Sequence, residues 1–193
     1  VQSFGYPSNI FNHKSFHTSQ KNINTLYILI GNSATETNHH SEILKKLEKY
    51  KNENIKIFAP LSYGDKDYAK KVTIEGEKIF KNKFIPIFDF MVYESYFQFL
   101  NTIDIAIFAH NRSQGMVNII NLLGLGKKVY IRTKIIPWSF FKDKNIEIFD
   151  FEKIELSILD KKIQDRNTKN ISSFFSEETL VNQLKTIFHV NKE

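Results

Sequence analysis

The sequence predicts a single α/β domain built on a Rossmann-like, doubly wound parallel sheet. Short apolar runs alternate with segments whose apolar residues recur at helical spacing, which is the pattern of strands joined by crossover helices. The first run, at 26–30, is apolar throughout, as expected of a strand covered on both faces. A length of 193 residues suits one such domain, and 41% hydrophobic residues are enough for an ordinary core.

The elements follow in order after residues 1–24, which are polar, lack a period and are predicted to be a linker or tail. The folded domain is expected at 25–193. Strands are expected at 26–30, 55–59, 84–88, 104–108 and 129–132. The intervening helices are expected to bury Ile43, Leu44, Leu47 and Tyr50, then Tyr68, Ala69, Val72, Gly76, Ile79 and Phe80, then Tyr93, Tyr96, Phe97 and Leu100.

Polar residues mark the expected helix starts. Asn38 or Ser41 is predicted to cap the first helix, and Asp65 or Asp67 to stand at the start of the second. Ser113 is predicted to cap an apolar fourth helix that runs to Leu125. After Pro137 the pattern predicts only a short strand near 147–149 and a last helix that Ser176 caps, with Leu180, Leu184, Ile187 and Phe188 facing inward.

The composition restricts compartment and chemistry. The absence of cysteine excludes disulfides, thiolate metal ligands and a cysteine nucleophile. No apolar run approaches the roughly 20 residues of a spanning helix, and the first residues do not have the pattern of a signal peptide. We therefore expect a cytoplasmic protein.

The formal net charge of +6 raises the question of an anionic partner. The basic residues are lysines apart from Arg112, Arg132 and Arg166, and they do not form a compact cluster interleaved with aromatic residues. The pattern therefore disfavours nucleic acid. A diffuse attraction to an anionic membrane surface, with peripheral association at the inner face of a bacterial plasma membrane, fits the charge better.

Ligands of open parallel sheets bind beyond the carboxyl ends of the strands, so the loops there are the candidate sites. Four loops qualify, at 31–40, 62–64, 89–93 and 110–115. In the first, Gly31 ends the strand, and Asn32 and Ser33 begin a polar loop whose N–H groups and hydroxyls suit an anion. The loop has neither the dinucleotide glycine pattern nor a P-loop lysine, and its spacing fits an ordinary strand-to-helix turn equally well.

The fourth loop carries Arg112 between a buried strand and an apolar helix. A guanidinium there suits a phosphate, although a surface arginine paired with a carboxylate explains the position equally well. Gln114, Gly115 and Asn118 lie within one turn of it and are candidates for the same cleft. Tyr63 is a candidate for stacking on a base, and packing is its more ordinary role.

No catalytic constellation is visible. The adjacent His39 and His40 have no ligand partner at zinc spacing, so we expect no metal and no other cofactor. Asp89, Glu94 and Asp104 show no paired spacing that would nominate an acid and a base, and the catalytic residues remain unassigned.

Several stretches together resemble the bacterial 4-alpha-L-fucosyltransferase-type family, whose members include the TDP-4-acetamido-4,6-dideoxygalactose transferases of enterobacterial common antigen synthesis. The resemblance spans about 26–188. Its most specific element is G-N-S followed by N-x-H-x-E, here Gly31, Asn32, Ser33, Asn38, His40 and Glu42. The sequences PLSYG at 60–64 and RSQG at 112–115, Trp138 and FFS at 174–176 add shorter matches.

The resemblance implies a two-domain GT-B glycosyltransferase. Its carboxyl-terminal domain, to which this chain corresponds, would bind a TDP-activated 4-amino-4,6-dideoxy or fucose-type sugar. The acceptor, a polyprenyl-linked saccharide, would be bound by an amino-terminal domain that we expect to be absent here, so we expect donor binding without complete transfer. Such enzymes offset the leaving diphosphate with helix N-termini and basic side chains instead of a metal, which makes Arg112 the implied diphosphate ligand.

Two other functions compete with this one. A non-catalytic α/β module for interaction or nucleotide binding is compatible with the fold class, although a receiver domain would need acidic residues where Gly31, Asn32 and Ser33 follow the first strand. A sugar-nucleotide epimerase or hydrolase of GT-B type would share the donor pocket and differ in its second domain.

Overall fold

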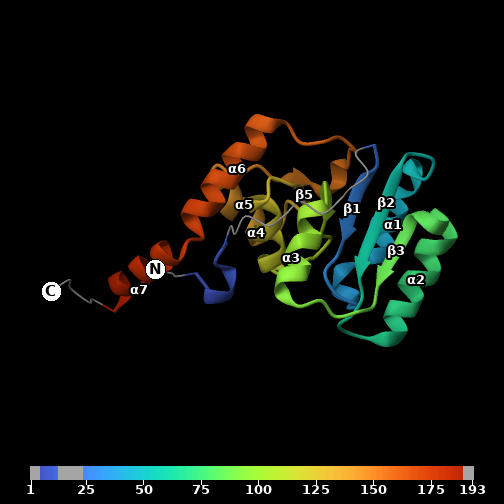
Figure 1. Cartoon of the computed structure of the whole chain (residues 1–193), viewed down its shortest axis with the longest axis horizontal. Helices are drawn as coiled ribbons and strands as arrows, with labels where there is room; N and C mark the ends of the chain where they lie inside the picture. The colour runs from blue at the N-terminus through green and yellow to red at the C-terminus, as the bar shows by residue number, and fades with distance from the viewer. Residues whose placement is uncertain (1–4, 13–23, 189–193) are drawn as a thin grey trace.

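A six-stranded parallel sheet forms the centre of the molecule (Figure 1). This computed structural model describes residues 5–12 and 24–188. The strands are β1 (Leu26–Ile30), β2 (Ile55–Pro60), β3 (Phe84–Ile87), β4 (Ile105–Ile107), β5 (Lys128–Ile131) and β6 (Phe149–Asp150). Their order, β3-β2-β1-β4-β5-β6, is that of a doubly wound Rossmann sheet, so the predicted fold class is confirmed.

Helices cover both faces of this sheet. The α-helices of the described residues are α1 (His40–Leu47), α2 (Lys66–Phe80), α3 (Tyr93–Thr102), α4 (Met116–Gly124), α5 (Ile136–Asp143), α6 (Lys161–Phe174) and α7 (Glu177–Ile187). Helices α1 and α2 bury their apolar faces in one core, and α3 to α6 bury theirs in a second core on the opposite face. In Figure 1, α7 extends away from the sheet beside the first described residues of the chain.

The strand order reverses between β1 and β4, and we call the edge at which these two strands end the crevice. From β1 the chain moves outward to β2 and β3 on one side, and it then returns to β4 on the other side of β1. The register pairs Ile28 with Ile105 and Ile30 with Ile107, so both strands end at the same edge. Because the following helices leave toward opposite faces, the loops after β1 and β4 flank the position where open α/β sheets bind ligands.

Two of the four predicted helix starts differ from the structure. Asp65 caps α2 and Ser176 caps α7, as predicted. Helix α1 instead begins after His39, which has a left-handed backbone and provides no side-chain cap. The predictions for Asn38 and Ser41 were wrong because the Asn38 amide turns back into its own loop and the Ser41 hydroxyl donates to Glu75.

Helix α4 is the second difference. It starts at Met116 after Gly115, which has a φ of 66° and no side chain to cap the helix, so the cap predicted at Ser113 was wrong. Because Ser113 lies two residues before the cap position, its hydroxyl is not at the helix start. The first N–H groups of α4 therefore face the crevice edge without a side-chain cap.

The carboxyl-terminal third contains more structure than its sequence pattern indicated. Helices α5 and α6 were not predicted. Helix α5 is short, with a proline in its first turn, and α6 buries only Asn167 and Ile171, so neither has a strong apolar stripe. A short helical turn, Pro7–Asn9, and the buried Phe11 belong to the stretch predicted as a linker, of which 1–4 and 13–23 lie outside the described residues.

Phe11 joins this amino-terminal segment to the domain. Its ring fills the space beside Gly124, where a Cβ would lie 2.5 Å from the ring, and its N–H donates to the Phe175 carbonyl at 2.8 Å. The Gly5 N–H donates to Gln183 Oε1 at 2.9 Å. These contacts hold residues near the two ends of the chain side by side against α4 and α7.

Candidate functional site

The loop after β1 is organised by one buried asparagine, Asn38. The Asn32 N–H donates to Asn38 Oδ1 at 2.9 Å, while Asn38 Nδ2 donates to Ser33 Oγ at 3.1 Å and to Thr35 Oγ1 at 2.8 Å. Asn38 is fully buried and Ser33 is 6% exposed. The Asn of the motif is therefore the internal scaffold of the loop, which leaves it no free group for a ligand.

Gly31 and His40 meet behind that loop. Gly31 has a φ of 62°, and a Cβ there would collide with His40 Nε2 and lie 2.8 Å from Asn38 Oδ1. His40 is completely buried, and its Nδ1 lies 3.2 Å from the Tyr68 hydroxyl. Burial, and next the neighbouring His110, lower the pKa of His40 to about 4, so its ring is neutral at pH 7. His40 therefore supports the loop from inside.

Glu42 also has a partner within the chain. Arg132, directly after β5, lies 2.5 Å from the Glu42 carboxylate through Nη2 and donates its Nε–H to the Ala109 carbonyl at 2.9 Å. Its guanidinium also stacks on the Phe151 ring. The ion pair thus joins α1 to the ends of β4 and β5, and Glu42 is engaged in this link rather than free for a donor.

We expect the Glu42–Arg132 pair to contribute about 1 kcal/mol, because the two side chains are 40% and 20% exposed and water screens part of their attraction. A double-mutant cycle of Glu42→Gln and Arg132→Met, followed by urea unfolding, measures this coupling. The exposed pair of Lys70 and Asp67 is a control for which coupling near zero is expected. Equal coupling in the two cycles would contradict the stabilising role of the first pair.

The loop after β4 presents a cation without a carboxylate partner. Arg112 is exposed and forms no ion pair with any carboxylate in 5–12 or 24–188. Arg132 and Arg166 pair with Glu42 and Glu147. The alternative interpretation, a surface arginine paired with a carboxylate, therefore has no support among the described residues. The Arg112 guanidinium is free to bind an anion beside the start of α4.

Neighbouring residues complete this edge of the crevice. Gln114 is partly buried, and its Oε1 is shielded from solvent without a hydrogen-bond partner among the described residues; the same is true of Asn32 Oδ1. A Cβ on Gly115 would lie 3.4 Å from Asn32 Oδ1, so the two loops are in close contact. Asn118 is partly buried in the first turn of α4.

Exposed aromatic residues lie at the same edge, beyond β2 and β3. Tyr63 is 77% exposed, and its carbonyl accepts the Ala34 N–H at 2.7 Å, which ties its loop to the loop after β1. Phe88 and Phe90 in the loop after β3, and Tyr93 at the start of α3, are 53%, 84% and 50% exposed. Flat aromatic surfaces of this kind are available to stack on a nucleobase.

One buried residue of this site lies in the candidate loop at 110–115 but was given no role there. His110 is 1% exposed, and its Nε2 lies 3.0 Å from Asn38 Oδ1, across the crevice. Burial is the main cause that lowers its pKa to about 4, and the positive Arg112 adds to the effect. Its place in the loop after a buried strand was visible in the sequence, but its partner 72 residues earlier was not.

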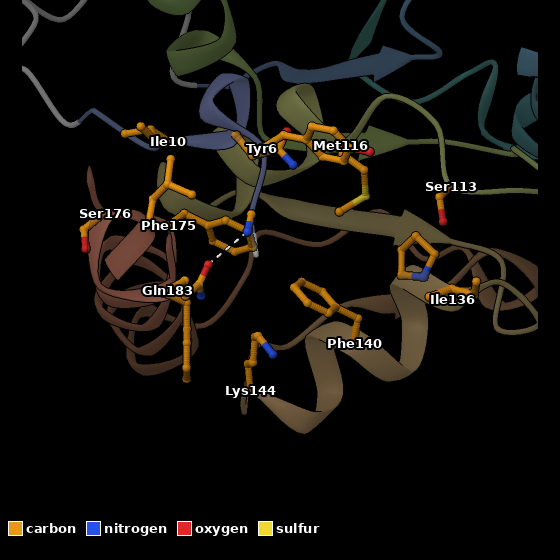
Figure 2. A pocket seen from close by; sticks show the side chains of 15 residues that line it. Tyr6, Ile10, Ser113, Met116, Ile136, Phe140, Lys144, Phe175, Ser176 and Gln183 are labelled. Atoms are coloured by element: carbon orange, nitrogen blue, oxygen red, sulfur yellow. Dashed lines mark hydrogen bonds between the residues drawn. The ribbon is translucent and has the colours of Figure 1, made fainter. Parts of the chain in front are cut away.

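A mostly apolar groove of about 320 Å³ adjoins this site (Figure 2). Tyr6 and Ile10, α5, and the start of α7 form its walls, and Ser113 and Met116 connect it to the loop after β4. The Lys144 ammonium lies 4.1 Å from the centre of the Phe140 ring at its rim. The groove was not predicted because it combines residues from both ends of the sequence.

Solved structures of low sequence identity share the fold of this chain. The chain aligns with WaaG, a glycosyltransferase involved in lipopolysaccharide biosynthesis (TM-score 0.57, 9% identity), over 89% of this chain and 48% of that one. It aligns with a glycosyltransferase from Rickettsia africae (0.60, 14%) over 86% and 47%. The C-terminal domain of the group 1 glycosyltransferase LpcC from Francisella tularensis (0.58, 12%) is matched over 86% and 87%.

These similarities show a Rossmann-like domain of the kind found in GT-B glycosyltransferases. The chain spans about half the length of WaaG and of the Rickettsia enzyme. Residues 4–188 match the model of the 4-alpha-L-fucosyltransferase family, glycosyl transferase group 56, and the chain belongs to this family. The predicted family is thereby confirmed. No helix within the described part of the chain is long and apolar enough to cross a membrane.

Proposed function

We propose that this chain is the donor-binding domain of a glycosyltransferase and that it holds the diphosphate of a nucleotide sugar in the crevice between β1 and β4. The observation that carries the proposal is Arg112, a cation without a carboxylate partner among the described residues, next to the uncapped start of α4. A helix N-terminus and a guanidinium both stabilise an anion, and the crevice is where this fold class binds ligands. Membership of the family supports glycosyl transfer as the reaction.

In this proposal the residues of the crevice have different roles in donor binding. Arg112 and the first N–H groups of α4 bind the diphosphate from one side, and the Asn32 and Ser33 loop faces it from the other. Gln114, Gly115 and Asn118 line the crevice beside α4, and Tyr63, Phe90 or Tyr93 stacks on the base. Asn38, His40 and Glu42 act through the loop and do not touch the donor.

The donor and the acceptor follow from the family resemblance. We propose a TDP-activated 4-amino-4,6-dideoxy or fucose-type sugar as donor. The acceptor is a polyprenyl-linked saccharide of cell-surface polysaccharide synthesis, and a second domain of the complete enzyme binds it at the inner face of the plasma membrane. Neutralisation of the leaving diphosphate by Arg112 and α4 makes a metal unnecessary for this step.

Thermal unfolding with TDP, UDP and GDP tests the donor site. A nucleotide at one hundred times its dissociation constant adds about 2.7 kcal/mol to the stability of the protein, and TDP is expected to give the largest rise in melting temperature. Arg112→Ala is expected to remove most of this rise. Arg166→Ala is the matched control because Arg166 pairs with Glu147 and lies outside the proposed site.

Unchanged melting temperatures with all three nucleotides at millimolar concentration would refute donor binding. In that case the exposed aromatic residues after β3 would favour an interaction module instead. A protein partner that is recovered by pull-down both with and without nucleotide would support that alternative. Hydrolysis of a TDP-sugar without any acceptor would instead indicate the sugar-nucleotide hydrolase.

A further inference from the structure

His110 forms the side-chain hydrogen bond that joins the two loops of the crevice at Asn38. Its ring follows β4, and its Nε2 lies 3.0 Å from Asn38 Oδ1 in the loop after β1. Both side chains are buried, at 1% and 0% exposure, so water does not compete for this bond. It bridges the two halves of the sheet at the point where the strand order reverses.

The hydrogen-bond network defines which ring nitrogen carries the proton. The Asn32 backbone N–H is a donor only, so the Asn38 atom that receives it is the amide oxygen. That same oxygen faces His110 Nε2, which must therefore be the donor. Because the pKa of His110 is lowered to about 4, the ring is neutral at pH 7 and carries one N–H. The ring also has the Gln114 backbone as a hydrogen-bond partner, but a proton on Nδ1 would leave two acceptors, Nε2 and Asn38 Oδ1, facing each other at 3.0 Å.

The ring of His110 also contacts the start of α4. A Cβ placed on Gly115 would lie 3.2 Å from His110 Cε1 and 3.4 Å from Asn32 Oδ1. The imidazole thus lies between the two elements that would face a bound diphosphate, the Asn32 loop and the first turn of α4. Next to it, Asn111 Nδ2 lies 3.1 Å from His39 Nε2 and forms a second, exposed link between the same loops.

We propose that His110 is a positioning residue of the donor site: its Nε2–H holds Asn38, and through Asn38 the Asn32 and Ser33 loop, in register with Arg112 and the N-terminus of α4. This inference rests on the proposed donor binding. His110 lies outside the family motif, and in this inference it fixes the position of one diphosphate-binding loop relative to the other. Because the loop is already ordered before the donor binds, the entropy cost of ordering it does not reduce the affinity for the donor.

The test compares His110→Gln, whose amide nitrogen can donate near the position of Nε2, with His110→Leu and His110→Asn. Leu has no donor, and the Asn side chain is one methylene shorter than that of Gln. Asn167→Ala is the control, because Asn167 is equally buried and its amide bonds the backbone N–H and carbonyl of Glu147 outside the proposed site. Urea unfolding establishes the stability of each variant.

Two measurements are made on each folded variant. Hydrogen exchange of the Asn32 amide in the ligand-free protein reports whether the loop is held, and calorimetric titration with TDP and UDP reports affinity. In His110→Leu and His110→Asn we expect exchange to accelerate at least about tenfold and affinity to fall roughly 10 to 30-fold. His110→Gln is expected to remain within about threefold of the wild type, and Asn167→Ala to change neither measurement beyond that range.

Three results would overturn the positioning role: unchanged affinity in His110→Leu or His110→Asn, a loss in His110→Gln as large as in those two, or an equal loss in the control. If His110→Leu does not fold, the Gln and Asn pair decides the question. Absence of nucleotide binding by the wild-type protein is a separate result that refutes the proposed function. If the wild type binds no nucleotide but the Asn32 amide still exchanges faster in the variants, the His110–Asn38 hydrogen bond only stabilises the fold. Both the positioning role and the proposed donor binding would then be refuted.

Discussion

Between pH 7.5 and pH 5 the free energy of unfolding is expected to fall by about 4 kcal/mol, because His40 and His110 are buried in their neutral forms. Both have a pKa of about 4 in the folded protein and near 6.5 once unfolded. Between these values the unfolded chain binds more protons than the native one, so stability rises with pH. It is fully present above about pH 7 and is lost as the pH falls through 6.5 toward 4, at about 2 kcal/mol per histidine by pH 5.

Urea unfolding at a series of pH values checks this expectation. His110→Gln removes one of the two groups and is expected to remove about half of the pH dependence, whatever its own effect on stability at pH 7.5. The double variant His40→Gln and His110→Gln is expected to have a nearly flat profile over this range. A wild-type stability that changes by less than about 1 kcal/mol between pH 7.5 and 5 would show that the two rings are not held neutral.

Gly31→Ala is expected to destabilise the fold by about 3 kcal/mol. The new methyl group would occupy a left-handed backbone conformation, with a φ of 62°, which costs an L-residue about 1 kcal/mol or more. It would also collide with His40 Nε2 and approach Asn38 Oδ1 to 2.8 Å, and both side chains are fully buried, so they have little room to move.

A matched glycine separates the two causes. Gly126 has a φ of 71°, and a Cβ there would lie 3.1 Å from Gln164 Cβ, a tight contact that a shift of a few tenths of an ångström relieves. Gly126→Ala is therefore expected to cost about 1 kcal/mol, mainly from the backbone. Replacing His40 by Ala should make room for the methyl group, so Gly31→Ala should cost about 1.5 kcal/mol less in that background. Equal losses at the two glycines, measured by urea unfolding, would contradict the steric role of the imidazole.

The burial of His40 and the space left by Gly31 give a physical reason for the motif that carries the family resemblance. Gly31, Asn38 and His40 depend on one another in this chain, because the glycine leaves space for the imidazole and the Asn38 amide ties the loop to itself. Glu42 extends the same arrangement to β5 through Arg132. The most specific sequence element of the resemblance therefore mainly determines the shape of the loop. In our proposal the neighbouring backbone N–H groups and Arg112 make the contacts with the donor.

The sheet could be predicted from the sequence because the signals of its strands are local. Each of β1 to β5 is a short apolar run, and α1 to α4 and α7 have a stripe of apolar residues at helical spacing. Helices α5 and α6, whose buried faces contain few apolar residues, were missed, and the starts of α1 and α4 were misplaced. Those two starts depend on left-handed residues, His39 and Gly115, rather than on capping side chains.

The strands, the helices α1 to α4 and α7, the family and the candidate loops could be predicted from the sequence, because each of these depends on residues close together in the chain. The tertiary structure decided which of those residues are free for a ligand. It paired Glu42 with Arg132, buried His40 behind Gly31, left Arg112 without a carboxylate among the described residues, and placed His110 against Asn38. Asn38 and His110 lie 72 residues apart in the chain, and Glu42 and Arg132 lie 90 apart. Only the strand order that places β4 and β5 beside β1 makes them neighbours.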